Sequence, residues 1–513
     1  MAYDLLMIAA LIGGILLGYP VAFTIAGIAT LFALTGWAMG DFDIALMGAL
    51  GQRVFGLITN DVLIAIPLFV FMGVLLQKSR IAEELLETMG RLFGSLRGGL
   101  GISVVLVGAL LAASTGIVGA TVIAMGMIAL PTMLRQGYDP RLASGLVCTA
   151  GTLGQIIPPS TLLIILSDVM SNAYQQAQFA EGRFTVETIS VGQMFAAALL
   201  PGLMLVGLYL LYLILRAWAS PGSAPAMEAG PLPGAGAVGR AVLPPVLLIV
   251  AVLGAILGGI ATPTEAASVG AVGAILMAAL RAGARPMLIL AGGAALVVLA
   301  LAAGVAPVRL QRSDAGMAEW ALGGAYAALA VLGAWAVIAA VRELDRRETL
   351  RDTLTSTLTV TAMIFATILT ASVFALVFVG FGGDERIAGI LEAMPGGPTG
   401  ALVFSMALVF ALGFFMDFVE ISVIVLPLIA PTLILMGHDP IWLAVLLAIN
   451  LQTSFLTPPF GFSLFYLRGA APPEITTGQI YAGVLPFIGL QILGMSLIWA
   501  LPGIATWLQA MLY

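Results

Sequence analysis

The sequence repeats itself after 300 residues, around two adjacent prolines inside a hydrophobic segment. Residues 129–140 (ALPTMLRQGYDP) lead to 152–160 (TLGQIIPPS), and residues 429–440 (IAPTLILMGHDP) lead to 452–460 (QTSFLTPPF). Each proline removes an amide donor and clashes with the preceding helical turn. In lipid such a break survives only where protein or a polar cavity satisfies the freed carbonyls. Matching breaks in two halves favour a transporter binding site over proline kinks without a ligand.

The composition places the chain in a membrane. Hydrophobic residues make up 61% of the 513 residues and charged residues 9%, whereas soluble proteins carry about 25% charged residues. At about 20 residues per span, the chain can cross the bilayer about a dozen times. The single cysteine, Cys148, excludes an internal disulfide, and the single histidine, His438, excludes a histidine-ligated metal cluster within the chain. No basic stripe indicates nucleic acid, and no organic cofactor is expected.

Apolar runs divide the chain into helices and larger units. Ordinary membrane helices are predicted at 3–18, 20–38, 61–77, 191–217, 241–258, 264–280, 286–306, 317–341, 352–380 and 478–510. The expected units are 1–99, N-terminal scaffold helices with an amphipathic arm at 79–97; 100–172, the first half of a transport domain; 191–351, scaffold helices with an extra helical pair at about 285–342; 352–397, a scaffold helix with a second arm at 384–395; 398–470, the second half of the transport domain; and 478–513, a C-terminal scaffold helix.

Two apolar segments, 100–135 and 398–436, are too long for one span. They are interrupted near their centres, by AASTGIVGAT (112–121) and by ALGFFMDFVE (411–420). We interpret each as a re-entrant helical hairpin whose tip stops inside the membrane. The alternative, two short helices joined outside, leaves each arm about 16 residues to cross about 30 Å, which is below the usual minimum. Together with the two discontinuous helices, this predicts an all-α polytopic membrane protein.

The placement of basic residues orients the two halves, because basic residues accumulate on the cytoplasmic side. Lys78, Arg80 and Arg97 precede the first hairpin and Arg135 follows it, so both of its ends face the cytoplasm. The polar stretch 172–190 is then periplasmic, and the second hairpin enters from the periplasm. The two halves are therefore predicted to be inverted repeats.

Five motifs in one order carry a family resemblance. They are Ile66-Pro67-Leu68-Phe69, Leu96-Arg97-Gly98-Gly99, Gly137-Tyr138-Asp139-Pro140, Ile157-Pro158-Pro159-Ser160 and Ala261-Thr262-Pro263-Thr264-Glu265-Ala266-Ala267. Over nearly the whole chain they resemble the large membrane subunit of tripartite ATP-independent periplasmic (TRAP) transporters. The first hairpin tip departs from the family, which often carries Ser-Gly-Ser where this chain has Ser114-Thr115-Gly116.

The resemblance implies an elevator-type secondary transporter of the bacterial cell inner membrane. It implies Na⁺ as the coupling ion, a small four-helix membrane subunit and a periplasmic substrate-binding protein as partners, and small organic acids as cargo. The extra helical pair resembles a subgroup associated with monocarboxylates such as 2-oxo acids or aromatic acids. The residues themselves support one part of this, since no GxxxxGK[ST] motif for ATP is present.

Unwound helices supply backbone carbonyls to Na⁺, and hairpin tips add side chains. The first predicted ion site contains Ser114, Thr115, Gly116, Thr152, Gly154 and Ile157, and the second contains Gly413, Met416, Asp417, Gln452, Thr453, Ser454 and Thr457. An acidic substrate is expected between the tips, held by hydroxyls and helix N-termini at Thr115, Pro159, Ser160, Thr457 and Pro458.

Asp417 has two interpretations. An acid inside the membrane is by default a functional candidate, but Asp417 with Glu420 three residues on also has the spacing of a helix cap. Asp139-Pro140, Asp439-Pro440 and the segment Thr262–Glu265 also have cap spacing, and we interpret these three as structural.

Rival functions make different demands on the sequence. A stand-alone sodium–dicarboxylate symporter of similar inverted-hairpin design works without a binding protein. A membrane subunit of a proton-pumping respiratory complex needs a row of mid-helix Lys, Glu or His, and the predicted spans are almost free of them. An enzyme is not expected, because no HExxH, GxSxG or similar catalytic set occurs.

Overall fold

The computed structural model describes residues 3–227, 232–308 and 316–513, apart from the side chains of Ala112, Ser114 and Thr115. Within these residues every regular element is a helix. Eleven described helical segments, one of them formed by α18, η3 and α19 together, are long and apolar enough to cross a membrane. The prediction of an all-α polytopic membrane protein is therefore confirmed.

The helices follow one another in three groups along the chain. The first half contains α1 (Tyr3–Leu16), α2 (Val21–Met39), η1 (Ile44–Ala49), α3 (Leu50–Ile58), α4 (Asp61–Lys78), α5 (Ile81–Phe93), α6 (Gly99–Thr115), α7 (Val118–Arg135), α8 (Pro140–Thr152), η2 (Leu153–Gln155), α9 (Thr161–Ala180) and α10 (Val191–Ala219). The middle contains α11 (Ala235–Leu257), α12 (Pro263–Arg281), α13 (Pro286–Val305) and α14 (Met317–Arg346). The second half contains α15 (Thr349–Gly380), α16 (Gly383–Glu392), α17 (Gly397–Leu412), α18 (Phe418–Glu420), η3 (Ile421–Val425), α19 (Leu426–Leu435), α20 (Pro440–Leu456), α21 (Phe462–Ala470), α22 (Thr477–Ala500) and α23 (Gly503–Leu512).

The two sequence repeats fold alike. In each, a helical hairpin (α6–α7 or α17–α19) is followed by a helix that stops before the double proline (α8 or α20) and a helix that resumes after it (α9 or α21). Both Pro–Pro peptide bonds are cis. We call α6–α9 and α17–α21 the repeat core, and all other helices the outer helices.

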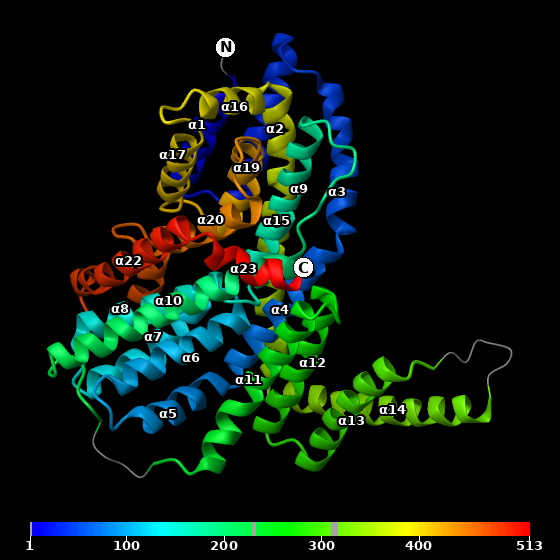
Figure 1. Cartoon of the computed structure of the whole chain (residues 1–513), viewed down its shortest axis with the longest axis vertical. Coiled ribbons are helices and arrows are strands. Elements are labelled where there is room, and N and C mark those ends of the chain that lie inside the picture. The colour runs from blue at the N-terminus through cyan, green and yellow to red at the C-terminus, as the bar shows by residue number, and fades with distance from the viewer. Residues whose placement is uncertain (1–2, 228–231, 309–315) are drawn as a thin grey trace.

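The two repeats interlock within the repeat core. Hairpin helix α7 packs on α8 of its own repeat and on α21 of the other. In the second repeat, α17 packs on α20 of its own repeat while α19 packs on α9 of the other. Each hairpin is thus held by both broken helices. Figure 1 shows α6, α7 and α8 side by side, with α17 and α19 above them in that view.

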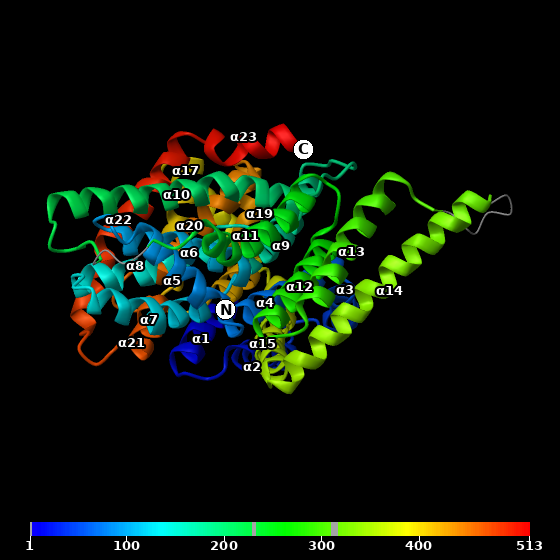
Figure 2. The same ribbon diagram turned by 90° about the horizontal axis from the view of Figure 1, so that it is seen from below.

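The two helices before the breaks are the most enclosed parts of the chain. In α8, 11 of 13 residues are buried, and in α20, 16 of 17 are buried. The outer helices instead carry large exposed apolar side chains, as expected for surfaces that face lipid. The extra pair α13–α14 is the most exposed, and both views show it projecting from the rest of the molecule (Figures 1 and 2).

The predicted helix caps are confirmed. Asp139 accepts a hydrogen bond from the Arg141 amide, and Asp439 accepts one from the Trp442 amide. Thr262 and Glu265 form a reciprocal capping box at the start of α12. Equivalent boxes start α10 (Ser190 with Gln193) and α22 (Thr476 with Gln479), so the repeat extends into these two outer helices.

The arm predicted at 79–97 forms the amphipathic helix α5, which buries Ile81, Ala82, Leu85, Leu86 and Gly90 against α6 and α11. The second arm, predicted at 384–395, forms α16.

One helix predicted to be continuous is broken in the structure. The segment 478–510 is broken into α22 and α23 at Pro502, which has no amide hydrogen for the carbonyl four residues before it. That carbonyl, of Ile498, accepts a hydrogen bond from the Trp442 indole at 3.0 Å. A side chain of the repeat core thus satisfies the freed group.

Other boundaries differ from the predicted ones. The interruption of the first hairpin is only Gly116-Ile117, so α7 has 18 residues and is long enough to span a membrane. Arm length therefore does not decide whether this hairpin is re-entrant.

The segment 44–58, not predicted from the sequence, forms η1 and α3. The first broken helix continues past residue 172 to Ala180.

The second hairpin is less regular than the first. Its returning arm passes through the π-helical segment η3 before α19, where Pro427 provides no amide hydrogen. The corresponding arm of the first hairpin, α7, is a continuous α-helix.

Helices α8 and α22 cross with their backbones in close contact, because both carry glycine at the crossing. A Cβ atom on Gly483 would lie 3.1 Å from the Gly145 amide nitrogen and would collide with the carbonyl of Arg141. Small residues at such crossings let membrane helices approach closely.

We expect Gly483→Ala to destabilise the protein by about 1–3 kcal/mol, because the added methyl overpacks a backbone contact. The control is Gly489→Ala on the same helix, where a Cβ would meet nothing within 4 Å. Thermal unfolding of both variants in detergent measures the difference. Equal melting temperatures for the two variants would contradict the proposed close crossing.

Candidate functional site

The two broken helices touch at equivalent positions. The side-chain amide of Gln452 on α20 donates to the hydroxyl of Thr152 on α8 at 3.3 Å, and both side chains are buried. These residues are 300 positions apart, which is the offset of the sequence repeat. The contact therefore marks the centre about which the two repeats are arranged.

At the first break, the hairpin turn lies directly on the start of α9. The Thr161 hydroxyl donates to the Gly116 carbonyl at 3.0 Å. Gly116 has a φ of +60°, and a Cβ there would lie 2.8 Å from the Thr161 amide nitrogen. Glycine is required on both counts, because other residues rarely adopt this conformation and none would fit.

At the second break, the other hairpin turn lies on the end of α20. A Cβ on Gly413 would lie 2.8 Å from the Cβ of Ser454 and would collide with its hydroxyl. The hydroxyls of Thr453, Ser454 and Thr457 each donate to a carbonyl of α20 itself, at 2.7, 2.8 and 2.7 Å. These three hydroxyl oxygens retain lone pairs that can accept further bonds.

Equivalent backbone carbonyls at the two breaks are capped in the same way. The Ser160 hydroxyl donates to the carbonyl of Gln155 at 3.0 Å, and the Ser463 hydroxyl donates to the carbonyl of Phe455 at 2.7 Å. Residues 155 and 455 are related by the repeat. A serine after each double proline thus satisfies a carbonyl that the interrupted helix leaves free.

Asp417 caps the returning arm of the second hairpin. Its carboxylate accepts from the Phe418 amide at 2.8 Å, and Glu420 accepts from the Asp417 amide at 2.9 Å. The capping interpretation of Asp417 is therefore confirmed. The two carboxyl groups therefore lie beside the turn that contains Gly413 and Met416.

Three buried polar side chains near the centre have atoms without a protein partner in the described part of the chain. They are both side-chain atoms of Gln155, the hydroxyl of Thr149 and the side-chain oxygen of Gln452. Unpaired buried polar groups are rare in native proteins, and a bound ion or water molecule is one explanation for them. Gln155 and Thr149 are not among the residues predicted from the sequence, although a glutamine between apolar residues of TLGQIIPPS is itself a signal.

The polar groups at the centre are mainly oxygen ligands. Among the described residues, no group of three or more His, Cys, Asp or Glu side chains lies close enough to hold a metal ion. The centre presents hydroxyl, amide and carbonyl oxygens, which are the ligands that hard cations take.

The two breaks differ in exposure. Pro159 and Ser160 are buried, whereas Thr457 and Pro458 are half-buried. Beyond them, the exposed ring of Phe460 packs against Phe414 and Phe415 of the second hairpin turn, with ring centroids 6.4 and 5.5 Å apart. An aromatic cluster therefore covers the second break, while the first is closed by the tip itself.

The structure places the remaining predicted residues at the same centre. Gly154 lies in the buried 3₁₀ turn η2, and the Ile157 amide donates to the Leu153 carbonyl at 3.0 Å. Met416 is buried, and its amide donates to the Leu412 carbonyl at 2.9 Å. The side chains of Ser114 and Thr115 lie outside the described part of the structure, so their predicted roles stay predictions.

A cavity of about 660 Å³ separates outer helices α3, α4 and α15 from α9 and α19 of the repeat core. Its polar lining includes Arg53, Asn60, Asp168, Asn172 and Asp384. One hydrogen bond crosses it, from the side-chain amide of Asn60, the N-cap residue of α4, to the Asp168 carboxylate on α9, at 2.8 Å. At the other end of α4, Gln77 donates to the Ala120 carbonyl of α7 at 3.1 Å.

Known proteins resemble this chain along its length. A family model described as the DctM component of tripartite ATP-independent periplasmic transporters matches residues 7–310 and 312–504. The C4-dicarboxylate TRAP transporter large permease protein DctM of Vibrio cholerae is 28% identical over 535 aligned positions, covering 100% of this chain and 98% of that protein. The ectoine TRAP transporter large permease protein TeaC of Halomonas elongata is 24% identical and covers 98% of each chain. Among solved structures, the YdaH transporter of Alcanivorax borkumensis shares the fold, with a TM-score of 0.55 at 16% identity over 90% of this chain and 88% of that one.

The central hydrogen bond gives a prediction. A double-mutant cycle of Thr152→Val and Gln452→Leu, unfolded in detergent without Na⁺, is expected to yield a coupling energy of about 0.5–1 kcal/mol, the usual size for an interhelical hydrogen bond. The matched control pairs Thr152→Val with Thr453→Val, whose hydroxyl bonds only within its own helix. Equal coupling in both cycles would show that the Thr152–Gln452 contact contributes nothing specific.

Proposed function

Because the chain belongs to the DctM family of tripartite ATP-independent periplasmic transporters, we propose that it is the large membrane subunit of a Na⁺-coupled importer of small organic acids. The predictions of this family, of a multi-pass inner-membrane protein and of a non-enzymatic role are confirmed by the family match and the candidate spans. The ion, the cargo, the partners and the motion are the proposed parts.

One observation carries the proposal. Each hairpin turn lies on the helix break of its own repeat, Gly116 at Thr161 and Gly413 at Ser454, and the Thr152–Gln452 bond joins the two breaks. Turns that end at a shared buried centre are what re-entrant hairpins require. Paired breaks at such a centre are where secondary transporters bind substrate and ion.

Two Na⁺ sites are proposed beside the breaks. The first uses oxygens of Gly116, Thr152, Gly154 and Ile157 with the predicted Ser114 and Thr115, and the unpaired side-chain oxygen of Gln155 is an additional candidate. The second uses Gly413, Met416, Asp417 and the segment 452–457. The free oxygen of Gln452 and the carboxylates of Asp417 and Glu420 support a cation there.

The substrate is proposed to lie between the tips, next to the first turns of α9 and α21. Neither helix has a side-chain N-cap hydrogen bond, so amides that favour an anion are not taken by their own caps. Thr115, Pro159, Ser160, Thr457 and Pro458 remain the proposed contacts. A small carboxylate is the proposed cargo, with 2-oxo and aromatic monocarboxylates among the candidates.

Two partners are proposed, a small four-helix membrane subunit and a periplasmic substrate-binding protein. The tripartite description of the matched family supports both. The outer helices expose an extensive apolar surface, which can contact a membrane partner as well as lipid.

An elevator motion is proposed, in which the repeat core moves against the outer helices. Where α3, α4 and α15 face α9 and α19, the interface that would slide holds a polar cavity crossed by the Asn60–Asp168 hydrogen bond. A cavity avoids the close packing that would resist sliding.

Reconstitution tests the proposed function. Uptake of radiolabelled acids into proteoliposomes is expected only with an inward Na⁺ gradient, the small subunit and the loaded binding protein together. A panel of C4-dicarboxylates, 2-oxo acids, aromatic monocarboxylates and ectoine identifies the cargo.

Leaving out Na⁺ or the two partner proteins tests separate parts of the proposal. Full uptake in Na⁺-free buffer would refute the ion coupling. Full uptake by this chain alone would favour a stand-alone symporter over a tripartite system.

A cross-link tests the proposed motion. In a Cys148→Ala background, Asn60→Cys and Asp168→Cys place thiols on α4 and α9, where the native side chains are 2.8 Å apart. A short, reducible thiol cross-linker is expected to abolish uptake, and reduction to restore it, because the two helices separate in each cycle.

The control joins two outer helices. Thr264 on α12 donates to the Asp61 carbonyl of α4 at 2.6 Å, so the pair Thr264→Cys and Asp61→Cys lies within the static part. Its cross-link is expected to leave uptake intact. Normal cycling of cross-linked Asn60→Cys/Asp168→Cys protein would exclude a rigid-body movement across this interface.

A further inference from the structure

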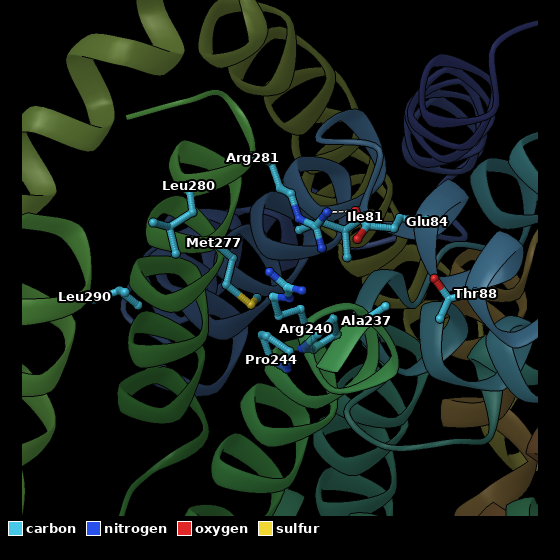
Figure 3. A pocket seen from close by; sticks show the side chains of 11 residues that line it. Ile81, Glu84, Thr88, Ala237, Arg240, Pro244, Met277, Leu280, Arg281 and Leu290 are labelled. Atoms are coloured by element: carbon cyan, nitrogen blue, oxygen red, sulfur yellow. Dashed lines mark ion pairs between the residues drawn. The ribbon is translucent and has the colours of Figure 1, made fainter. Parts of the chain in front are cut away.

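A second cavity lies away from the transport site, at the end of the outer helices beside the amphipathic arm. It has a volume of about 590 Å³ and is bounded by α5, α11 and α12, with Leu290 of α13 at its edge. Figure 3 shows its lining side chains. None of them belongs to the repeat core, so the transport mechanism does not account for this cavity.

One end of the cavity is positively charged. Arg281 of α12 forms an ion pair with Glu84 of α5, and Arg240 of α11 brings a second guanidinium beside them (Figure 3). Arg240 donates from Nε to the Gly236 carbonyl of its own helix at 3.0 Å. Within the described part of the chain, no protein group accepts from its two terminal nitrogens. Two arginines against one glutamate leave an excess positive charge.

The other wall is apolar and open to the outside. It is formed by Pro244, Met277, Leu280 and Leu290. Leu290 is 61% exposed on α13, and α11, α12 and α13 all have the length and composition of membrane spans. The cavity therefore combines a cationic end with a wall that faces lipid.

Helix ends place the cavity at a membrane boundary. Helices α4 and α12 end beside it at Lys78 and Arg281, while α11 and α13 begin there at Ala235 and Pro286. The basic residues at these ends indicate the cytoplasmic side. A headgroup of the inner leaflet lies at this depth, with its acyl chains directed toward the bilayer centre.

We propose that this cavity binds an anionic phospholipid, with the headgroup phosphate at Arg240 and Arg281 and an acyl chain along Met277 and Leu290. Guanidinium groups pair with phosphate oxygens through two parallel hydrogen bonds, and the free terminal nitrogens of Arg240 supply such a pair. Glu84 holds Arg281 in place and links the site to α5. Because the walls come from α5, α11 and α12, the bound lipid stabilises the docking of the arm on the outer helices.

Native mass spectrometry of the purified full chain tests the site. The chain is titrated with phosphatidylglycerol and with phosphatidylcholine of the same acyl chains, and we expect preferential retention of phosphatidylglycerol. Arg240→Gln is expected to lower this affinity about fivefold, the size for one arginine near an anionic lipid surface. Arg240→Lys keeps the charge and loses the paired geometry, so an intermediate loss is expected.

The matched control is Arg97→Gln. Arg97 is exposed at the end of the same arm, on the same side of the membrane, and does not line the cavity. It removes the same charge and is expected to leave lipid retention unchanged. Equal losses for Arg97→Gln and Arg240→Gln would overturn the site in favour of general surface attraction.

A thermal-shift experiment distinguishes a lipid from a free phosphate. Phosphatidylglycerol is expected to raise the melting temperature of the wild type, with the rise absent in Arg240→Gln, whereas glycerol 3-phosphate gives no rise. Equal protection by glycerol 3-phosphate would overturn the lipid assignment. A lowered melting temperature of Arg240→Gln in the absence of lipid, with an undiminished phosphatidylglycerol shift, would show that Arg240 is only structural.

Discussion

The need to satisfy backbone groups inside an apolar environment determines how this protein is built. Two double prolines interrupt two helices where water is scarce, and each freed carbonyl there requires a donor. The protein supplies them from its own side chains: Ser160 for Gln155, Ser463 for Phe455 and, at the later break before Pro502, Trp442 for Ile498. The two serines reach carbonyls close by in the sequence, whereas Trp442 reaches Ile498 because α20 packs on α22.

The same constraint explains why the proposed transport site is polar without being strongly charged. Hydroxyls, amides and carbonyls are tolerated in a buried place when they are paired, while charges are costly there. The two acids beside the second break are held by backbone amides through a cap. Among the described residues, the exceptions include atoms of Gln155, Thr149 and Gln452 at or before the breaks, as well as atoms on α15, α17, η3 and α22. Arg240 and Arg281, the basic groups of the proposed phospholipid site, lie instead near helix ends.

The sequence predicts the repeat, the caps and most outer helices because these depend on local features. Proline and aspartate spacing, apolar run length and capping boxes act over a few residues, and they place Asp139, Asp439 and Thr262 correctly. The pairing of Thr152 with Gln452 has no local signal, because it joins helices that only the tertiary fold brings together. Helix α3 shows the same limit, because it is short and mixes polar and apolar residues. The Asn60–Asp168 hydrogen bond shows it too, because the two residues are distant in sequence. Pro502 is a local signal, but the apolar run on both sides of it favours one continuous helix.

The two repeats have similar breaks, but the helices that resume after those breaks differ in length. Helix α9 continues for 20 residues and ends in a turn where Gln178 and Glu187 exchange hydrogen bonds, whereas α21 stops after nine residues. Any exchange between two arrangements of the repeat core is therefore an exchange between unequal states, since the two faces of the molecule are not copies of each other. A soluble partner of the proposed kind that contacts only the face carrying the longer helix would therefore bind the two arrangements with different affinities.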